Sequence, residues 1–210
     1  SCSARGCQSP SHSAASLSAS CVRLTIIRAG KSGPPDWKTC HISLTVYSGE
    51  SEAVPVTLPD ITVSPGGFRQ INSVLDVAGS GVRNGYVRVE RVAGSAPYYA
   101  YGVINDQANS DGSFVAPVSE TELRGHEGLT LPVIVEAGTF ASELVLTNSS
   151  GVTRTVRASF VAEGVQTPDA STVFTLQLAP GQQAIVPNFI QTLRDNGVSG
   201  IAPPGNPLAG

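Results

Sequence analysis

The segment YYAYGVINDQANSDGSFV, residues 98–115, ends in acidic and amide side chains of the types that bind calcium. Calcium takes about six to eight oxygen ligands from the carboxylates, amides and carbonyls of a loop. Asp106, Asn109 and Asp111 could supply three of them. The bidentate glutamate that a calcium loop needs would fall at Val118. We therefore favour a turn capped by its own side chains over a calcium site, and we expect no other cofactor.

Three tyrosines near this segment could stack on a sugar ring: Tyr86, Tyr99 and Tyr101. Tyr99 and Tyr101 share one face of an extended strand because side chains alternate with a period of two. Their flat rings could form a strip that binds a polysaccharide. Tyrosines on neighbouring strands also pack against each other across the sheet, and this is the more frequent role.

All four cysteines, Cys2, Cys7, Cys21 and Cys40, lie within the first 40 residues. Four cysteines allow three pairings, and the sequence does not choose among them. Zinc sites usually place two cysteines two to four residues apart, but the gaps between these cysteines are four, 13 and 18 residues. We expect disulfides or unpaired thiols rather than zinc.

The sequence carries no recognisable catalytic motif. The nucleophile elbow G-x-S-x-G and the zinc-protease motif H-E-x-x-H do not occur, and His126 lies in the glycine-flanked segment RGHEG. The SPGG turn, residues 64–67, leads into an extended segment and not into the helix that a phosphate-binding loop requires. We therefore expect a protein that is not an enzyme, with no catalytic residue.

The composition favours a soluble β-protein with many turns. The 210 residues are 40% hydrophobic and 14% charged, and they include 22 glycines and 15 prolines. The net charge of −3 gives no electrostatic reason to bind nucleic acid. No apolar run approaches the ~18 residues that a membrane-spanning helix requires, so we expect no membrane insertion.

The alternation of apolar and polar residues predicts strands along most of the chain. The segments GYVRVERV, residues 85–92, and YYAYGVIN, residues 98–105, are separated by the turn AGSAP and predict a β-hairpin. After the SPGG turn, Ile71, Val74 and Leu75 follow helical spacing and predict one or two helical turns. Residues 1–20 show no periodicity and predict a disordered or weakly ordered leader.

An internal repeat divides the chain into two units. ITVSPGGFRQINSVLDVAG resembles LQLAPGQQAIVPNFIQTLRDNG, with Pro65 matching Pro180 at a spacing of 115 residues (180 − 65 = 115). We expect a first β-sandwich unit at 21–118 and a linker, or the first strand of the next unit, at 119–138. The second unit would then cover residues 139–210.

The second unit is shorter than the first after its Pro-Gly turn. Only 30 residues follow Pro180 (210 − 180 = 30), and none of them resembles the hairpin of residues 85–105. A sheet without this hairpin would have an open edge with unpaired backbone groups. Such an edge accepts a strand, and we expect the strand to come from a neighbouring repeat unit or from another chain.

The chain resembles the tandem, Ig-like β-sandwich units of large secreted or surface proteins of bacteria. The resemblance covers roughly residues 41–195 and includes LVLTNSS (144–150) and LAPGQQ (178–183). It implies a non-catalytic extracellular module and carries no functional residue over to this sequence.

The sequence therefore predicts an all-β protein of two tandem Ig-like antiparallel β-sandwich units, each with a short helical turn after a Pro-Gly turn. We expect a structural, spacer or adhesion module of a larger protein, located outside the cell or on its surface. The alternative is a carbohydrate-binding accessory module of a secreted hydrolase, with Tyr99 and Tyr101 as its stacking strip.

Overall fold

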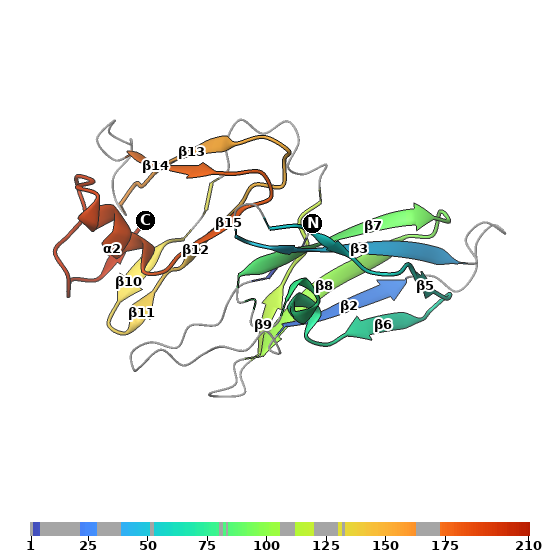
Figure 1. Cartoon of the computed structure of the whole chain (residues 1–210). Helices are drawn as coiled ribbons and strands as arrows, with labels where there is room; N and C mark the ends of the chain where they lie inside the picture. Colours follow the sequence, from blue (N-terminus) through green and yellow to red (C-terminus); the bar gives the residue numbers. More distant parts are fainter. Residues whose placement is uncertain are drawn as a thin grey trace. The chain divides into compact units, whose positions relative to one another are not determined.

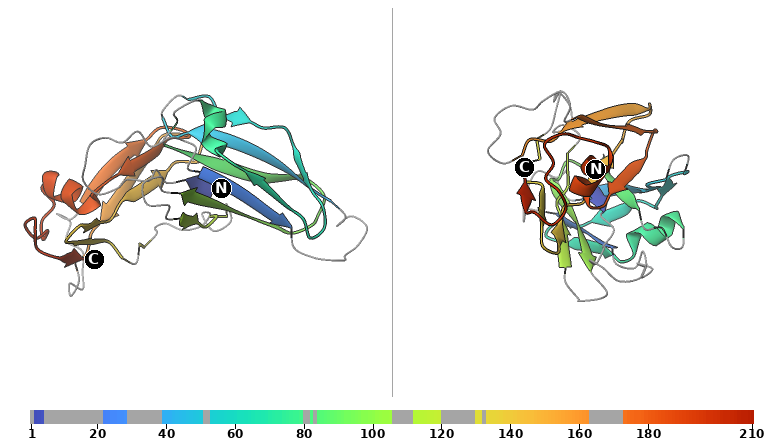
Figure 2. Two further views of the ribbon diagram at one scale, coloured as in Figure 1. Left: turned by 90° about the horizontal axis from the view of Figure 1, so that it is seen from below. Right: turned by 90° about the vertical axis from the view of Figure 1, so that its left-hand side faces the viewer.

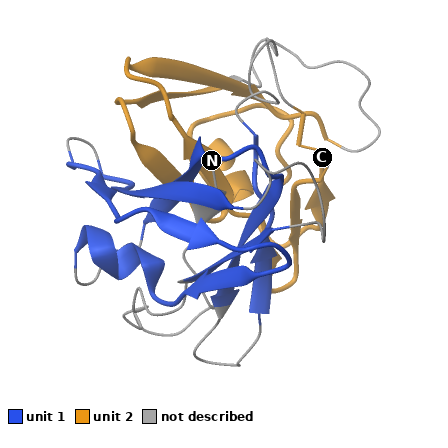
Figure 3. Cartoon of the chain, turned by 90° about the vertical axis from the view of Figure 1, so that its right-hand side faces the viewer, with its two compact units in different colours: residues 1–125 blue, residues 126–210 orange. Residues whose placement is uncertain are grey.

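The chain folds into two compact units, Ser1–Gly125 and His126–Gly210 (Figure 3). The computed structural model describes residues 2–4, 22–28, 39–50, 53–79, 82, 84–105, 112–119, 130–131, 133–162 and 173–210 (Figure 1). Strands dominate the described residues, every strand pair in them is antiparallel, and the helices among them are short. The prediction of an all-β chain is confirmed.

The first unit contains two sheets. One sheet has the order β1-β7-β3-β4, with β5 also paired to β3. Its strands are β1 (Cys2–Ala4), β7 (Gly85–Ala93), β3 (Cys40–Ser48), β4 (Val56–Thr57) and β5 (Ile61–Val63). The other sheet has the order β6-β2-β8-β9. Its strands are β6 (Phe68–Ile71), β2 (Val22–Arg28), β8 (Tyr98–Asn105) and β9 (Gly112–Val115).

Both sheets contribute to one hydrophobic core. In β3 every second residue is buried, and Ile42, Leu44 and Val46 are all 0% exposed. Ile26 of β2 is likewise 0% exposed and belongs to the same core. The helix η3 (Val74–Ala78) adds Val74 and Leu75. In β3 the alternation read from the sequence therefore identifies the face that is buried.

The predicted hairpin of residues 85–105 is wrong in its pairing. β7 pairs with β1 and β3, whereas β8 pairs with β2 and β9, so the two strands belong to different sheets. Gly94 in the link has φ +79°, and a Cβ there would collide with the carbonyl oxygen of Thr39. Arg91 Nη1 donates to the carbonyl oxygens of Ser95 and Ala96, 3.3 Å away in both cases. We call β7, the link and β8 the β7–β8 arch.

The predicted leader is described only at Cys2–Ala4. These three residues form β1, where Cys2 lies opposite Val87 and Ala4 lies opposite Gly85. The sequence predicts no strand there, because three residues are too few to show a period. Residues 5–20 lie outside the described part of the chain.

The second unit is built from short strands and one helix. These are β10 (Val135–Ala137), β11 (Phe140–Ala141), β12 (Leu144–Thr147), β13 (Arg154–Ser159), β14 (Val173–Leu178), β15 (Gln183–Val186), α2 (Phe189–Asp195) and β16 (Leu208–Ala209). β12 pairs with β15, β13 pairs with β14, and β10 pairs with β11 and β16. The core includes Phe174, Phe189 and Ile190. Figure 2 gives two further views of α2 and the C-terminal strand, in orange and red.

The two units repeat one local geometry. Each has a strand, a Pro-Gly turn, a second strand and a short helix. Gly66 and Gly181 in the turns have φ +68° and +72°. Ser73 and Asn188, which precede the two helices, have φ +51° and +49° and are 115 residues apart (188 − 73 = 115). Among the described residues these two are the only non-glycine residues with positive φ, so the repeat extends to the backbone conformation.

Asn148 holds the second unit's Pro-Gly turn in place. The side chain is 5% exposed, and its Nδ2 donates to the carbonyl oxygens of Val152, Leu178 and Ala179 at 2.8, 3.0 and 2.9 Å. Its Oδ1 accepts from the backbone N–H and the hydroxyl of Ser150. One amide group thus joins the loop of residues 148–152 to the start of the Pro-Gly turn, which gives the LTNSS motif a structural role.

We expect Asn148→Ala to destabilise the chain by about 2–3 kcal/mol, because it leaves buried carbonyl oxygens without donors. Urea unfolding followed by circular dichroism measures this free energy. Ser149→Ala is the matched control, since Ser149 is the exposed neighbour and its loss should cost less than about 0.5 kcal/mol. Equal stability of the two variants would contradict the assigned role.

Candidate functional site

The outer surface of the sheet β6-β2-β8-β9 carries a cluster of exposed apolar side chains. We call this cluster the aromatic face, and it consists of the exposed Ile27, Phe68, Tyr99 and Phe114 together with the half-buried Tyr101. Ile27 lies opposite Phe68 on one side and opposite Tyr99 on the other, so all three point to the same side of the sheet. Tyr101 follows Tyr99 by two residues, and Phe114 lies opposite Val103.

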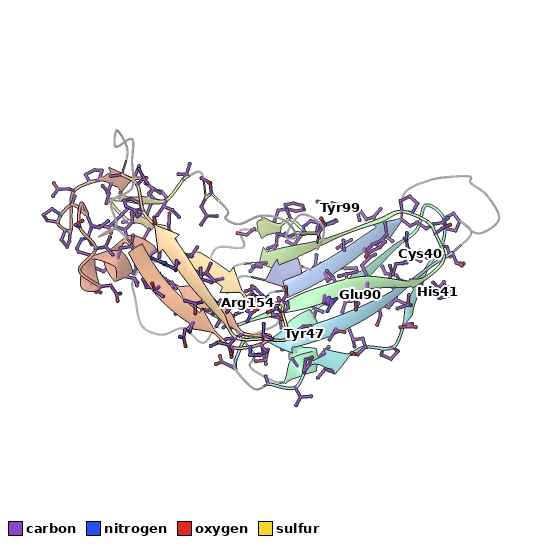
Figure 4. All side chains as sticks on the ribbon, turned by 90° about the horizontal axis from the view of Figure 1, so that it is seen from above. Cys40, His41, Tyr47, Glu90, Tyr99 and Arg154 are labelled. Carbon is purple, nitrogen blue, oxygen red and sulfur yellow. The ribbon has the colours of Figure 1, made fainter. Side chains whose placement is uncertain are left out.

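The rings of the aromatic face lie in contact but leave much of their surface open. The ring centroids of Tyr99 and Tyr101 are 6.2 Å apart, and those of Tyr101 and Phe114 are 5.3 Å apart. Phe68 is 67% exposed, Tyr99 is 49% exposed and Phe114 is 61% exposed. An exposed apolar cluster of this kind is typical of a binding surface. Figure 4 labels Tyr99 on this sheet.

Polar side chains border the rings. Arg23 Nε donates to Asn72 Oδ1 at 3.0 Å, and Gln70 Nε2 donates to the same oxygen at 3.1 Å. Arg23 and Val103 are opposite each other in the ladder of β2 and β8. Gln70 and Tyr101 both lie opposite Thr25. The face thus combines flat rings with hydrogen-bond donors, the groups that bind the apolar and hydroxyl surfaces of a sugar.

Sequence reasoning identifies only part of this face. Tyr99 and Tyr101 lie on it because Ala100 and Ile104, the alternating residues of β8, are buried in the core. Phe68 joins the face because β6 pairs with β2, and Phe114 joins it because β9 pairs with β8. Their sequence signal, a single phenylalanine in each of two short strands, does not reveal which strand they lie beside.

Tyr86 does not belong to the aromatic face. It lies on β7 in the other sheet, is 1% exposed and stacks on Tyr47 with a centroid distance of 4.6 Å and an angle of 3° between the rings. Figure 4 shows Tyr47 and Tyr99 on different strands of the first unit. A buried ring offers no surface to a sugar, so Tyr86 has a packing role.

The environment of Tyr86 disfavours ionisation. Burial and, to a lesser extent, the neighbouring Tyr47 together raise the pKa of Tyr86 to about 12, although Arg88 opposes both effects. The hydroxyl is buried and has no hydrogen-bond partner among the described residues. The neutral phenol is therefore the form that the folded chain keeps.

Cys40 is a free thiol inside the core. It is 0% exposed, and burial raises the pKa of its thiol, which keeps it protonated and unreactive. Of the other disulfide candidates, the structure describes only the backbone of Cys2, and Cys7 and Cys21 lie outside the described residues. Cys40 thus packs as a small apolar side chain.

The calcium candidates Asp106, Asn109 and Asp111 lie outside the described residues. Within the described ranges, no group of three or more histidine, cysteine, aspartate or glutamate side chains could hold a metal ion. His41 lies beside Thr62 on the neighbouring strand, with 3.2 Å between Nδ1 and the hydroxyl oxygen. In the same residues no helix has the length and apolar character needed to cross a membrane.

Comparison with protein-family models, with curated proteins and with solved structures found no match. Function is therefore argued from the residues of this chain. Two features carry that argument: the repeated geometry of the two units, and the aromatic face of the first unit.

We expect Tyr86→Phe to leave stability at neutral pH unchanged or increased, because it removes a buried hydroxyl without a partner. The pKa of Tyr86 is higher in the folded chain than its ordinary value of 10.0, so its contribution to stability is complete below pH 10 and is lost as pH rises toward 12. The unfolding free energy should therefore fall from pH 10 to 12 less steeply in Tyr86→Phe. Tyr47→Phe is the control and should retain the steeper fall; identical slopes in all three proteins would contradict the assignment.

Proposed function

We propose that the chain consists of two tandem Ig-like β-sandwich units and serves as a non-catalytic structural or adhesion module of a larger secreted or surface protein. The repeated geometry is the observation that carries this proposal. The same strand, Pro-Gly turn, strand and helix recur, with matching positive φ at Ser73 and Asn188. Repetition of a unit that folds around its own core is typical of proteins that extend a chain in space.

The polar clusters of the second unit support this role because they join structural elements. Arg194 of α2 forms an ion pair with Glu136 of β10 at 3.2 Å, with both side chains mostly buried. Its Nε donates to the carbonyl oxygen of Ala202 at 2.9 Å, which ties the C-terminal segment to the helix. Together with Asn148, these residues use their hydrogen-bonding capacity within the fold.

The proposed location predicts that the protein is accessible on intact cells that produce it. Brief trypsin treatment of these cells should release peptides of the chain, since trypsin cleaves after lysine and arginine and the sequence contains 13 of these residues. A cytoplasmic protein of the same cells serves as the control and should stay intact. Recovery of the peptides from the cytosolic fraction after lysis, and never from intact cells or their medium, would refute the location.

The aromatic face favours a second candidate function, a carbohydrate-binding accessory module of a secreted hydrolase. Tyr99 and Phe114 are exposed, and Arg23 and Gln70 place donors beside the rings. Sugar rings stack on exposed aromatic side chains while their hydroxyls take hydrogen bonds from neighbouring polar groups. Adhesion by the same face is compatible with the structural role.

The carbohydrate hypothesis predicts that the chain is retained on an insoluble polysaccharide, with cellulose and chitin as the probes. The double variant Tyr99→Ala/Tyr101→Ala should bind about tenfold more weakly, because it removes two stacking rings. Phe140→Ala is the matched control, since this ring is 74% exposed but lies on β11 of the second unit. No retention of the unaltered chain, or equal loss in both variants, would exclude the face as a sugar site on these polymers.

A further inference from the structure

Among its described residues, the second unit lacks two strand pairings that the first unit has. In the first unit β2 pairs with β6 and β8, and β3 pairs with β5 and β7. Among the described residues of the second unit, β12 pairs with β15 alone and β13 pairs with β14 alone. One edge of each strand therefore lacks a neighbouring strand there.

The ladders show which strands of the two units are equivalent. Leu24 of β2 lies opposite Ile71, and Leu144 of β12 lies opposite Val186, which is 115 residues further on (186 − 71 = 115). The backbone N–H of Arg28 donates to Gly67, just as that of Asn148 donates to Gln182. Hence β12 corresponds to β2.

β13 corresponds to β3 by the same comparison. Val63 and Leu178 precede the two Pro-Gly turns, and both are 1% exposed. Val63 lies opposite Cys40 at the start of β3, and Leu178 lies opposite Arg154 at the start of β13. The missing neighbours of β12 and β13 are therefore the counterparts of β8 and β7, the two strands of the β7–β8 arch.

The backbone of β12 shows which groups face the open edge. The N–H and C=O of Asn148 both bond toward the β15 side, to Gln182 and from Gly181. Alternate residues of an antiparallel strand direct these groups to opposite edges. The N–H and C=O of Val145 and Thr147 therefore point away from β15. The corresponding groups of β2, those of Thr25 and Ile27, face β8 in the first unit.

The inward side chains of β12 and β13 are also less buried than their counterparts in the first unit. Ile26 of β2 is 0% exposed, whereas Leu146, its counterpart on β12, is only half-buried. Leu44 of β3 is 0% exposed, whereas Ala158, its counterpart on β13, is also half-buried. After α2 the chain continues to β16, which pairs with β10 and not with β12 or β13.

We propose that the second unit accepts a β-arch, one strand of which pairs with β12 while the other pairs with β13. The first unit serves as the template for its register. The residue that takes the place of Tyr101 would lie opposite Val145, and the one in place of Tyr99 opposite Thr147, as these tyrosines lie opposite Thr25 and Ile27. The occupant has small or apolar residues at its inward positions and a short glycine-containing link.

The occupant is a separate arch segment and not the β7–β8 arch of a second copy. That arch already fills its own unit, where Val87 is 3% exposed and Ile104 is 2% exposed. Its removal would expose the core of the first unit, so exchange between two folded copies is disfavoured. The inference rests on the proposed role of the chain as a repeated module. It does not depend on the proposed location, because the open edges of β12 and β13 belong to the fold itself.

The probe for this site is a labelled peptide of residues 85–105, which has the sequence of the β7–β8 arch. We expect saturable binding to the full chain, and binding about tenfold or more weaker to Val145→Pro, which removes an N–H from the open edge without breaking the β12–β15 ladder. Ile185→Pro is the matched control. Ile185 lies directly opposite Val145, so its N–H points to the outer edge of β15, and this variant should bind as the unaltered chain does.

Melting temperatures establish that both variants are folded before the titration. A peptide with Ala100→Asp and Ile104→Asp, which places charge at two inward positions, should not bind. Absence of binding by the unaltered peptide, or equal binding to both proline variants, would overturn the proposal. Self-association of the chain that Val145→Pro abolishes, without peptide binding, would also overturn it in favour of edge-to-edge pairing of two copies. The trypsin experiment on intact cells tests the proposed location and does not depend on peptide binding. Failure of the proposed function and failure of the β-arch proposal can therefore be distinguished.

Discussion

Pairing along both edges of β2 and β3 is the constraint on which the first unit depends. β2 and β3 are flanked on each side, and their inward residues, among them Ile26 and Leu44, are 0% exposed. The β7–β8 arch supplies one of these neighbours to each sheet, so a single segment contributes an inner strand to both sheets and helps to cover the core between them. Backbone groups that lack a partner and apolar side chains that lack cover both carry a free-energy cost.

In both units, residues with positive φ lie in the connection between the sheet and the helix. Ser73 and Asn188 adopt a left-handed conformation before the helix, and glycines at 66 and 181 do so in the preceding turn. Asn148 then fixes the second turn through hydrogen bonds donated to Leu178 and Ala179. The polar side chain of Asn148 therefore has structural partners, while the aromatic face of the first unit keeps its rings accessible.

The sequence predicts much of the strand content, because alternation identifies the buried face of a strand. It does not identify the neighbour of that strand. The residues of β7 and β8 alternate as a hairpin would, yet each strand pairs in a different sheet. For the same reason Tyr99 and Tyr101 were predictable as neighbours, whereas Phe68 and Phe114 join them only through pairing. Tyr86 was predicted as a sugar-stacking residue together with Tyr99 and Tyr101, but it lies in the other sheet and stacks on Tyr47.

Amide hydrogen exchange of the chain alone, read residue by residue by NMR, tests the central claim most directly. The account predicts slow exchange for the N–H groups of Thr25 and Ile27, which face β8, and fast exchange for those of Val145 and Thr147, their counterparts on the open edge of β12. The N–H of Leu146 faces β15 and should exchange more slowly than either neighbour in β12. Equal protection of Thr25 and Val145 would contradict the account.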